Sequence, residues 1–149
     1  MENNVLTVCK KMLFQEPFYG SILVQLQKQI SKEIPTACVG LNGASFKLLI
    51  NLDFWNSLNP DQQKGLIKHE LGHIIYFHLT DYSHLKNHEI ANIAMDIFIN
   101  QTIPENELPP NPCMWNGYKN LKPDMSTNWY YEQLEDNYNK KSCPNTISP

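Results

Sequence analysis

The sequence predicts an α+β fold that is mostly helical and includes a small antiparallel sheet or β-hairpin. Apolar residues recur at helical spacing in five segments, which is typical of amphipathic helices. Asn42-Gly43 lies between two short apolar runs, and this dipeptide is a strong short-range signal for a hairpin. The chain has 149 residues, enough to bury one core, so we expect a single domain.

The N-terminal third is predicted to form two helices followed by two strands. Val5, Cys9 and Met12 are spaced for one face of the first helix. A Pro-Phe-Tyr-Gly break separates the two helices, and Pro35 ends the second one. The predicted elements are helices over 3–16 and 21–34 and strands near 36–41 and 45–51.

The remaining segments are predicted to be three helices joined by loops. Asn59 is a favourable N-cap and Pro60 suits the first helical position, so the third helix begins there. Pro104 ends the fourth helix, and the proline-rich stretch after it predicts a long ordered loop. The helices span about 60–79, 88–103 and 126–141, and the loop spans 104–125. We expect the domain to cover residues 1–140, with a flexible tail over 141–149.

Composition and charge argue against several classes of function. The net charge is −3, so there is no electrostatic case for nucleic-acid binding. All twelve basic residues are lysines, and the absence of arginine removes the usual bidentate partner of phosphates. No apolar run is long enough to span a membrane, and the first residues do not resemble a signal peptide. We therefore expect a cytoplasmic protein with neither nucleic-acid nor membrane partners.

The segment His-Glu-Leu-Gly-His at positions 69–73 carries the clearest chemistry in the sequence. On a helix, residues four apart differ by about 40° around the axis, so His69 and His73 can bind one metal ion from the same face. Glu70 lies about 100° from His69, which is too far for comfortable ligation. It is well placed to accept a proton from a metal-bound water. Zinc with three protein ligands and one open position suits this arrangement.

The third ligand must come from outside the motif. His78 would lie about 140° from His73 on an uninterrupted helix, so its geometry is unfavourable. Asp96 is favoured, because a carboxylate within the apolar segment Ala-Met-Asp-Ile-Phe would be unstable without a partner or a metal.

Other polar residues near Asp96 leave alternatives open. Glu89, Asn92 and Asn100 share one helical face with Asp96, as residues that support a metal site would. Glu89 is the next candidate for the third ligand. The alternatives as metal ligands or supporting residues are His78, Glu89 and Asn92. His84 and His88 are expected at the surface.

The order of these motifs resembles a known family. The motif helix, the segment Asn-Ile-Ala-Met-Asp-Ile-Phe-Ile-Asn, a proline-rich loop and the segment Ser-Thr-Asn-Trp-Tyr-Tyr-Glu-Gln-Leu follow one another. This order is similar to the "putative metallopeptidase domain" of bacterial and phage proteins, which is often fused to a von Willebrand factor A-like domain. The resemblance covers roughly residues 10–135. Two departures are Gly72, where the family has a larger apolar residue, and a missing arginine near the end of the motif helix.

The resemblance implies a minimal zincin-like fold in which His69, His73 and Asp96 bind zinc and Glu70 is the general base. We therefore expect a zinc-dependent metallopeptidase of the HExxH type that acts on a peptide or protein substrate. The hairpin before the motif would offer an edge strand to an extended peptide. The alternative is a catalytically silent, zinc-stabilised structural or interaction domain, such as a phage-encoded component of a larger assembly. Glu70 distinguishes the two, because a purely structural site does not need it.

Overall fold

A computed structural model describes the backbone of residues 2–147 and the side chains of residues 4–140. It has the α+β architecture predicted from the sequence, with a three-stranded sheet and a majority of helix. The helices are α1 (Glu2–Gln15), α2 (Pro17–Leu23), α3 (Leu52–Asn56), α4 (Pro60–Ile75), α5 (His88–Asn100) and α6 (Thr127–Ile147). The strands are β1 (Gln27–Ile30), β2 (Ala37–Asn42) and β3 (Ser45–Ile50), and short 3-10 turns are η1 (Glu105–Glu107) and η2 (Trp115–Gly117).

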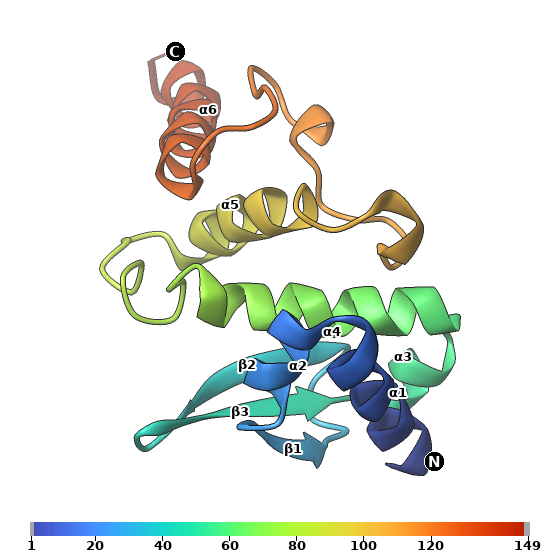
Figure 1. Ribbon diagram of the computed structural model, residues 1–149. Helices are drawn as coiled ribbons and strands as arrows, with labels where there is room; N and C mark the ends of the chain where they lie inside the picture. The colour runs from blue at the N-terminus through green and yellow to red at the C-terminus, as the bar shows by residue number, and fades with distance from the viewer. Residues whose placement is uncertain (1, 148–149) are drawn as a thin grey trace.

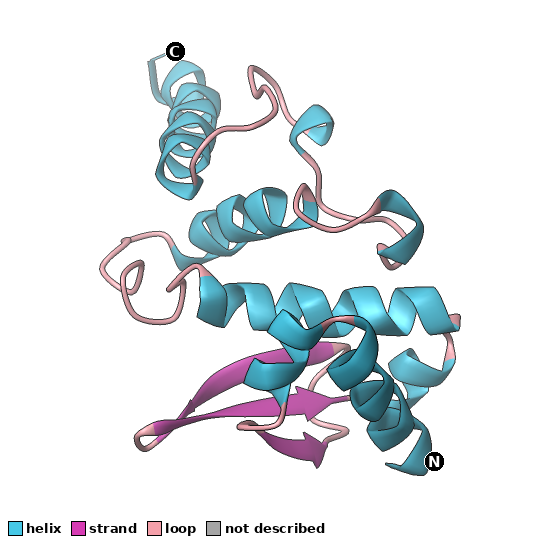
Figure 2. Cartoon of the chain, in the orientation of Figure 1, coloured by secondary structure: helices cyan, strands magenta, loops and turns pink. Residues whose placement is uncertain are grey.

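The elements form successive layers with α4 at the centre (Figure 1). The sheet and helices α1 to α3 lie on one side of α4, and α5 lies along its other side. Helix α6 packs on α5, so the two ends of the chain lie at opposite ends of the molecule. Figure 2 shows that all the strands are on the first side of α4, whereas the second side consists of helices and loops. None of the described helices is long and apolar enough to cross a membrane.

The predicted hairpin is present and contributes one edge of the sheet. Strands β2 and β3 pair antiparallel, with Val39 opposite Leu48, and Gly43 has a positive φ of 65° in the turn. Glycine reaches this conformation at little cost, which explains its place between the strands. The strand order is β1-β3-β2, so β2 lies at the sheet edge. That edge runs beside α4, the helix that carries the histidine motif.

The prediction of a helix over 21–34 is wrong beyond Leu23, and the Pro-Phe-Tyr-Gly segment, predicted to be a break, is itself the first part of α2. Helix α2 ends at Leu23, and Gln27–Ile30 instead form β1, which pairs in parallel with β3. The side chains of β1 alternate, with the two glutamines exposed and Lys28 and Ile30 partly buried. Pairing with a distant strand provides backbone hydrogen bonds that local helical periodicity cannot reveal.

The prediction that the motif helix continues to residue 79 is also wrong. Helix α4 ends at Ile75, and Phe77 adopts a left-handed conformation with a φ of 58°. The chain then turns back, and the His78 N–H donates to the His73 carbonyl at 2.9 Å. This break occurs without a glycine, so the sequence has no obvious signal for it.

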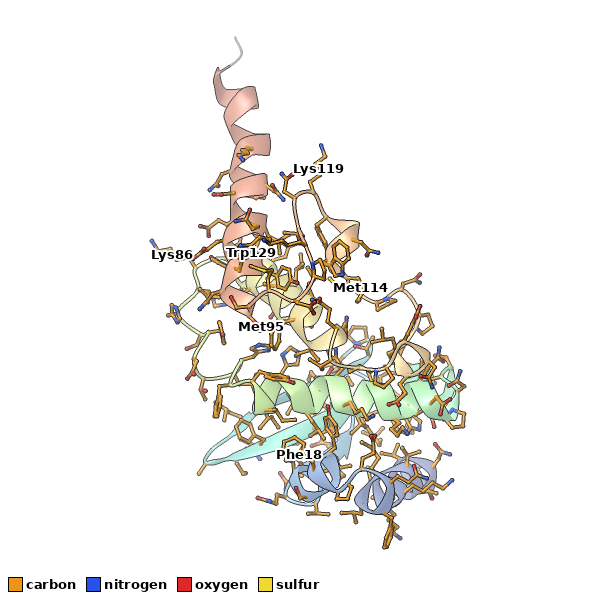
Figure 3. The ribbon with its side chains drawn as sticks, turned by 45° about the horizontal axis from the view of Figure 1, so that its top comes forward. Phe18, Lys86, Met95, Met114, Lys119 and Trp129 are labelled. Carbon is orange, nitrogen blue, oxygen red and sulfur yellow. The ribbon has the colours of Figure 1, made fainter. Side chains whose placement is uncertain are left out.

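Two hydrophobic cores lie on the two sides of α4. The first contains Leu48, Trp55 and Leu71, and it joins the sheet to helices α1 to α4. The second contains Ala94, Ile97 and Tyr130, and it joins α5 to α6 and the loop between them. In Figure 3, Met95 and Trp129 lie on the side of α4 that carries the second core, and Phe18 of α2 lies on the side that carries the first. The predicted flexible tail over 141–149 falls on residues whose side chains lie outside the described part of the chain.

Candidate metal centre

Helix α4 holds the His-Glu-Leu-Gly-His motif because its start is well defined. The Asn59 side chain accepts from the Gln62 N–H at 2.9 Å, and the Gln62 side chain accepts from the Asn59 N–H at 3.1 Å. This reciprocal capping box, with Pro60 in the first turn, sets the rotation of the helix. The predicted N-terminus is therefore confirmed, and His69 and His73 both project from α4 toward α5.

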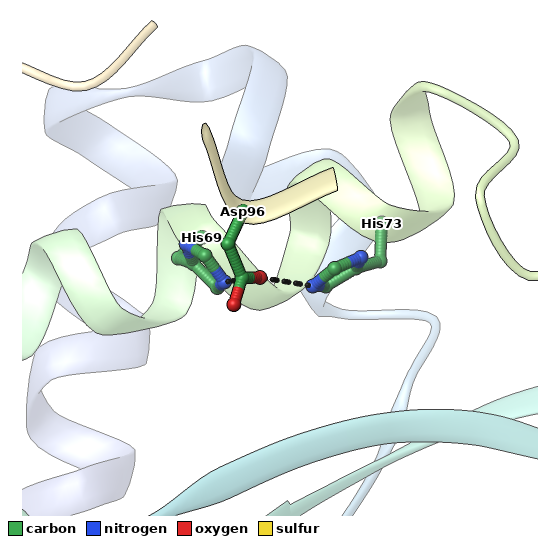
Figure 4. Close-up of side chains that lie close together, drawn as sticks. All are labelled: His69, His73 and Asp96. Atoms are coloured by element: carbon green, nitrogen blue, oxygen red, sulfur yellow. Dashed lines mark hydrogen bonds and ion pairs between the residues drawn. The ribbon is translucent and has the colours of Figure 1, made fainter. Parts of the chain in front are cut away.

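Three side chains bring their ligand atoms together between α4 and α5. Asp96 Oδ1 lies 3.0 Å from His69 Nε2 and 3.6 Å from His73 Nε2 (Figure 4). The ligand atoms of all three residues lie within 4.8 Å of one another. Two ligands of a tetrahedral zinc ion are about 3.4 Å apart, given bonds of about 2.0–2.2 Å. The donor set and its spacing therefore fit a zinc ion.

Asp96 is less buried than the sequence led us to expect. Its side chain is 36% exposed, although its neighbours Met95 and Ile97 are buried. Partial burial acts to raise the pKa of Asp96, but hydrogen bonds and the charges of His69 and His73 outweigh it and hold that pKa well below its usual range. The carboxylate is therefore ionised, as metal ligation requires, and it remains partly accessible to solvent.

The tautomer of His69 is set by Asn100, which is 6% exposed. The Asn100 Nδ2 donates to the Cys113 carbonyl at 3.0 Å, so its Oδ1 must face His69 Nδ1 at 2.7 Å. An amide oxygen only accepts, and His69 therefore carries its proton on Nδ1 and leaves Nε2 for a metal. Burial acts to lower the pKa of His69, but the hydrogen bond with Asp96 and the charge of Glu70 outweigh it and raise that pKa.

Glu70 is placed between the metal centre and the sheet edge. It is only 7% exposed, and its carboxylate accepts a hydrogen bond from the backbone of Val39 in β2. Burial raises the pKa of Glu70, although His69, His73 and the Val39 hydrogen bond act to lower it. A raised pKa in a buried carboxylate is typical of a group that exchanges protons near neutral pH.

His78 lies beside His73 and outside the set of converging ligand atoms. Its Nδ1 is 3.3 Å from His73 Nδ1, the nitrogen of His73 that faces away from Asp96. The side chain is 3% exposed, and burial together with His73 lowers the pKa of His78 to about 4. His78 is therefore neutral at physiological pH, and it contacts His73 on the side of the ring that faces away from Asp96.

The other candidate residues lie away from the three ligand atoms. Glu89, Asn92, His84 and His88 are exposed, and Glu89 lines a separate groove of about 560 Å³ between α5, α6 and the loop that joins them. Of the polar face predicted on α5, the structure thus brings only Asp96 and Asn100 to the motif.

Gly72 explains how α5 approaches α4 so closely. A Cβ atom at this position would lie 2.9 Å from Ile99 Cγ2, and Ile99 is completely buried. The resemblance identified Gly72 as a departure from a larger residue, and the structure shows that this departure provides space for Ile99. The close approach brings Asp96 within reach of both histidines.

Three contributors to the site were not predicted from the sequence. They are the backbone N–H of Val39, the carbonyl of Cys113 and the hydroxyl of Thr127, which contacts His78 Nε2 at 3.1 Å. The first two are main-chain groups and carry no sequence signal. Thr127 is 2% exposed at the start of α6. Threonine is common at helix starts, so the sequence gives no sign that this residue also contacts a histidine.

Comparison with known proteins identifies one family. No curated protein and no solved structure matches the chain significantly. A family model described as "Putative metallopeptidase domain" matches residues 3–142, which span the sheet, the motif helix and α5. The resemblance seen in the sequence is thereby confirmed over nearly the whole chain, and the protein belongs to this family.

Proposed function

We propose that this protein is a zinc-dependent peptidase. The observation that carries the proposal is the convergence of His69, His73 and Asp96 beside the buried carboxylate of Glu70. Two imidazoles and one carboxylate form a catalytic zinc donor set, because they leave a fourth position open. The partial exposure of Asp96 provides access to that position.

A zinc ion held by these residues would act as a Lewis acid toward the substrate carbonyl and lower the pKa of a bound water. Glu70 accepts the proton of the attacking water and then donates it to the leaving nitrogen. Its raised pKa suits both transfers, because the group must be a base in one step and an acid in the next. The Val39 hydrogen bond holds the carboxylate toward the metal centre.

An extended peptide is the substrate that the edge of β2 would accept. Asn42 and Ser45 form the pair next to the turn, so Val39 and Leu41 direct their backbone groups away from β3. A peptide that adds to this edge as a further strand would hydrogen-bond the backbone of Leu41 and the carbonyl of Val39, because the Val39 N–H already donates to Glu70. Because Val39 also contacts Glu70, the scissile bond of such a peptide would lie next to the base.

A structural role for zinc is the second candidate, and one observation favours it. The centre joins α4 of the first core to α5 of the second, so a bound ion would hold the two cores together. This role requires the three ligands but gives no reason for Glu70 to be buried beside them at a desolvation cost.

Substitution of Glu70 separates the two candidates. We expect the wild type to hold about one zinc per chain and to cleave an unfolded protein such as reduced casein. Glu70→Gln should retain zinc and fold but lose at least about 100-fold in cleavage rate, since a general base contributes about 10²–10⁴-fold. Zinc content is measured by atomic absorption and cleavage by fluorescence of a labelled substrate.

The control is Glu89→Gln, an equivalent change at an exposed position of α5. It should alter neither zinc content nor cleavage. If the wild type binds zinc but cleaves no member of a peptide library, the structural role is correct and the peptidase proposal is wrong.

A further inference from the structure

His78 occupies a closed pocket behind the metal centre. The rings of Tyr76, Tyr82 and Phe98 surround it at centroid distances of 5.2–6.2 Å. With 3% of the residue exposed, water cannot satisfy both ring nitrogens. The described polar partners of its side chain are His73 Nδ1 at 3.3 Å and Thr127 Oγ1 at 3.1 Å. Each ring nitrogen of His78 thus has one partner, and the partners lie on different helices.

The contacts form a chain from Asp96 through His73 and His78 to Thr127. His73 Nε2 lies on the side of Asp96, and its Nδ1 faces His78. A metal ion binds an imidazole nitrogen that carries no proton, so ligation through Nε2 leaves the proton of His73 on Nδ1. His73 must then donate to His78 Nδ1. His78 in turn carries its own proton on Nε2 and needs an acceptor there.

We propose that Thr127 is a positioning residue for the metal centre. Its hydroxyl oxygen accepts a hydrogen bond from His78 Nε2, and this bond holds His73 in the metal-binding tautomer. The proposal rests on the zinc centre proposed above and is independent of whether the centre cleaves peptides. The opposite proton arrangement would place a hydrogen on His73 Nε2, directed at the metal position. The Thr127 hydroxyl can accept at this site, and among the described residues it is the hydrogen-bond partner of His78 Nε2.

This arrangement makes metal affinity depend on how α6 packs. Thr127 is the first residue of α6, and Ser126 caps the helix through a 3.1 Å bond from the Trp129 N–H. Tyr130, one turn further on, is completely buried and donates to the Lys122 carbonyl at 2.8 Å. The hydroxyl of Thr127 is therefore held by the packing of α6 on α5. Helix α6 follows the motif by some fifty residues, yet it contributes to the orientation of a motif histidine.

The first experiment compares zinc affinity across threonine variants, using competition with a chromophoric chelator. Thr127→Val keeps the shape of the side chain but removes the acceptor, and we expect zinc affinity to fall by about 10–100-fold. Thr127→Ser retains the hydroxyl and should bind zinc within about 3-fold of the wild type. Thr102→Val is the matched control, because the Thr102 hydroxyl bonds the Ile99 carbonyl and is not in the chain of contacts. Equal affinities of Thr127→Val and wild type would overturn the proposal.

A double-mutant cycle distinguishes positioning from a general packing effect. In a His78→Phe background the chain of contacts from Thr127 to His73 is already interrupted. Adding Thr127→Val should then change zinc affinity by less than about 2-fold. An unchanged 10–100-fold loss in that background would show that Thr127 acts by another route and would overturn the proposal. Thermal unfolding of each metal-free variant checks that the fold is retained.

The wild-type protein offers a test that needs no variant. Long-range ¹H–¹⁵N correlation spectra of the zinc-loaded protein should show His78 protonated on Nε2 and unprotonated on Nδ1. The reverse tautomer would overturn the relay. If the wild type fails to bind zinc, the metal centre itself is wrong and the relay fails with it. If zinc binds and the Thr127 results hold while no peptide is cleaved, only the peptidase proposal fails.

Discussion

Asp96 shows how a single residue completes a site that the motif begins. It reaches both histidines through one oxygen, Oδ1, from a helix that packs against the motif helix. The sequence indicated Asp96 because an acid in an apolar segment requires a partner. Its exposure to solvent could not be inferred in the same way, because it depends on where the loop after α5 runs. The partly open carboxylate suits a catalytic site better than a fully enclosed one.

Removal of Asp96 should abolish stoichiometric zinc binding. We expect Asp96→Ala to lose the metal during gel filtration, since two histidines alone do not close a zinc site. His78→Ala should keep about one zinc per chain at saturating metal, with lower affinity, because its nitrogen faces His73 and not the ligand atoms. Atomic absorption measures both. Zinc retained in Asp96→Ala and lost in His78→Ala would contradict the ligand assignment.

At the scale of elements, α4 joins the two halves of the molecule. One side carries the candidate metal ligands His69 and His73, and another carries Lys68, which is 4% exposed. Lys68 Nζ lies 2.5 Å from Glu16 Oε2, between α1 and α2, and 2.6 Å from Glu107 Oε1 in η1. Both oxygens are buried and have no other hydrogen-bond partner among the described residues. The lysine therefore compensates the buried carboxylate of Glu107 and the one buried oxygen of Glu16, from distant parts of the chain.

Lys68→Met should destabilise the fold by about 3–5 kcal/mol, because it leaves the buried oxygens of Glu16 and Glu107 with only the more distant, partly exposed Lys64 nearby. Lys64→Met is the matched control one turn earlier. Lys64 lies 3.8 Å from Glu107 and 4.0 Å from Glu16 and is 23% exposed, so its loss should cost less than about 1 kcal/mol. Urea denaturation of the metal-free proteins measures both changes. Similar costs for the two variants would contradict the assignment.

The contribution of Lys68 should also depend on pH. Burial acts to lower the pKa of Lys68, but its hydrogen bonds with Glu107 and Glu16 outweigh burial and raise that pKa above 10.5. The folded protein therefore holds this proton more tightly than the unfolded chain. The stability that Lys68 provides is complete below pH 10.5 and is lost as pH rises through the folded pKa. Urea denaturation of wild type and Lys68→Met should show a difference in stability that narrows at alkaline pH.

At the scale of the whole molecule, the candidate metal centre lies between two cores. His69 and His73 belong to the helix that packs on the sheet, and Asp96 belongs to the helix that packs on α6. Helix α4 meets α5 where Gly72 lies against Ile99 and where His69 and His73 contact Asp96. An ion bound here would therefore stabilise the relative placement of the cores as well as each helix.

Zinc should accordingly stabilise the whole fold. A ligand that binds only the folded state adds about 2.7 kcal/mol when its free concentration is 100 times its Kd. We expect added zinc to raise the urea midpoint by a corresponding amount and to slow amide exchange in α5 and α6. Asp96→Ala should show neither effect. Exchange that slows only within α4 would show that the metal does not join the two halves.

Local patterns predicted much of this molecule correctly. The hairpin, the capped start of α4, and helix α5 all follow from short-range signals such as Asn42-Gly43 and Asn59-Pro60. The errors lie where distant segments decide the outcome. Gln27–Ile30 is a strand because β3 pairs with it. Helix α4 ends at Ile75, after which Phe77 is left-handed and His78 packs against Phe98 of α5. Neither partner is visible within the window that determines helical periodicity.

The sequence by itself selected the candidate residues. His69, Glu70 and His73 share a helix whose geometry follows from backbone chemistry, and Asp96 is an acid within an apolar segment. Only the tertiary structure decided how those residues are supported. Glu70 is held by the Val39 N–H, His69 by Asn100, and His73 by His78 together with Thr127. These groups come from β2, α5, the turn after α4 and α6. Their convergence depends on packing between segments far apart in the chain, and such packing is a property of the folded molecule as a whole.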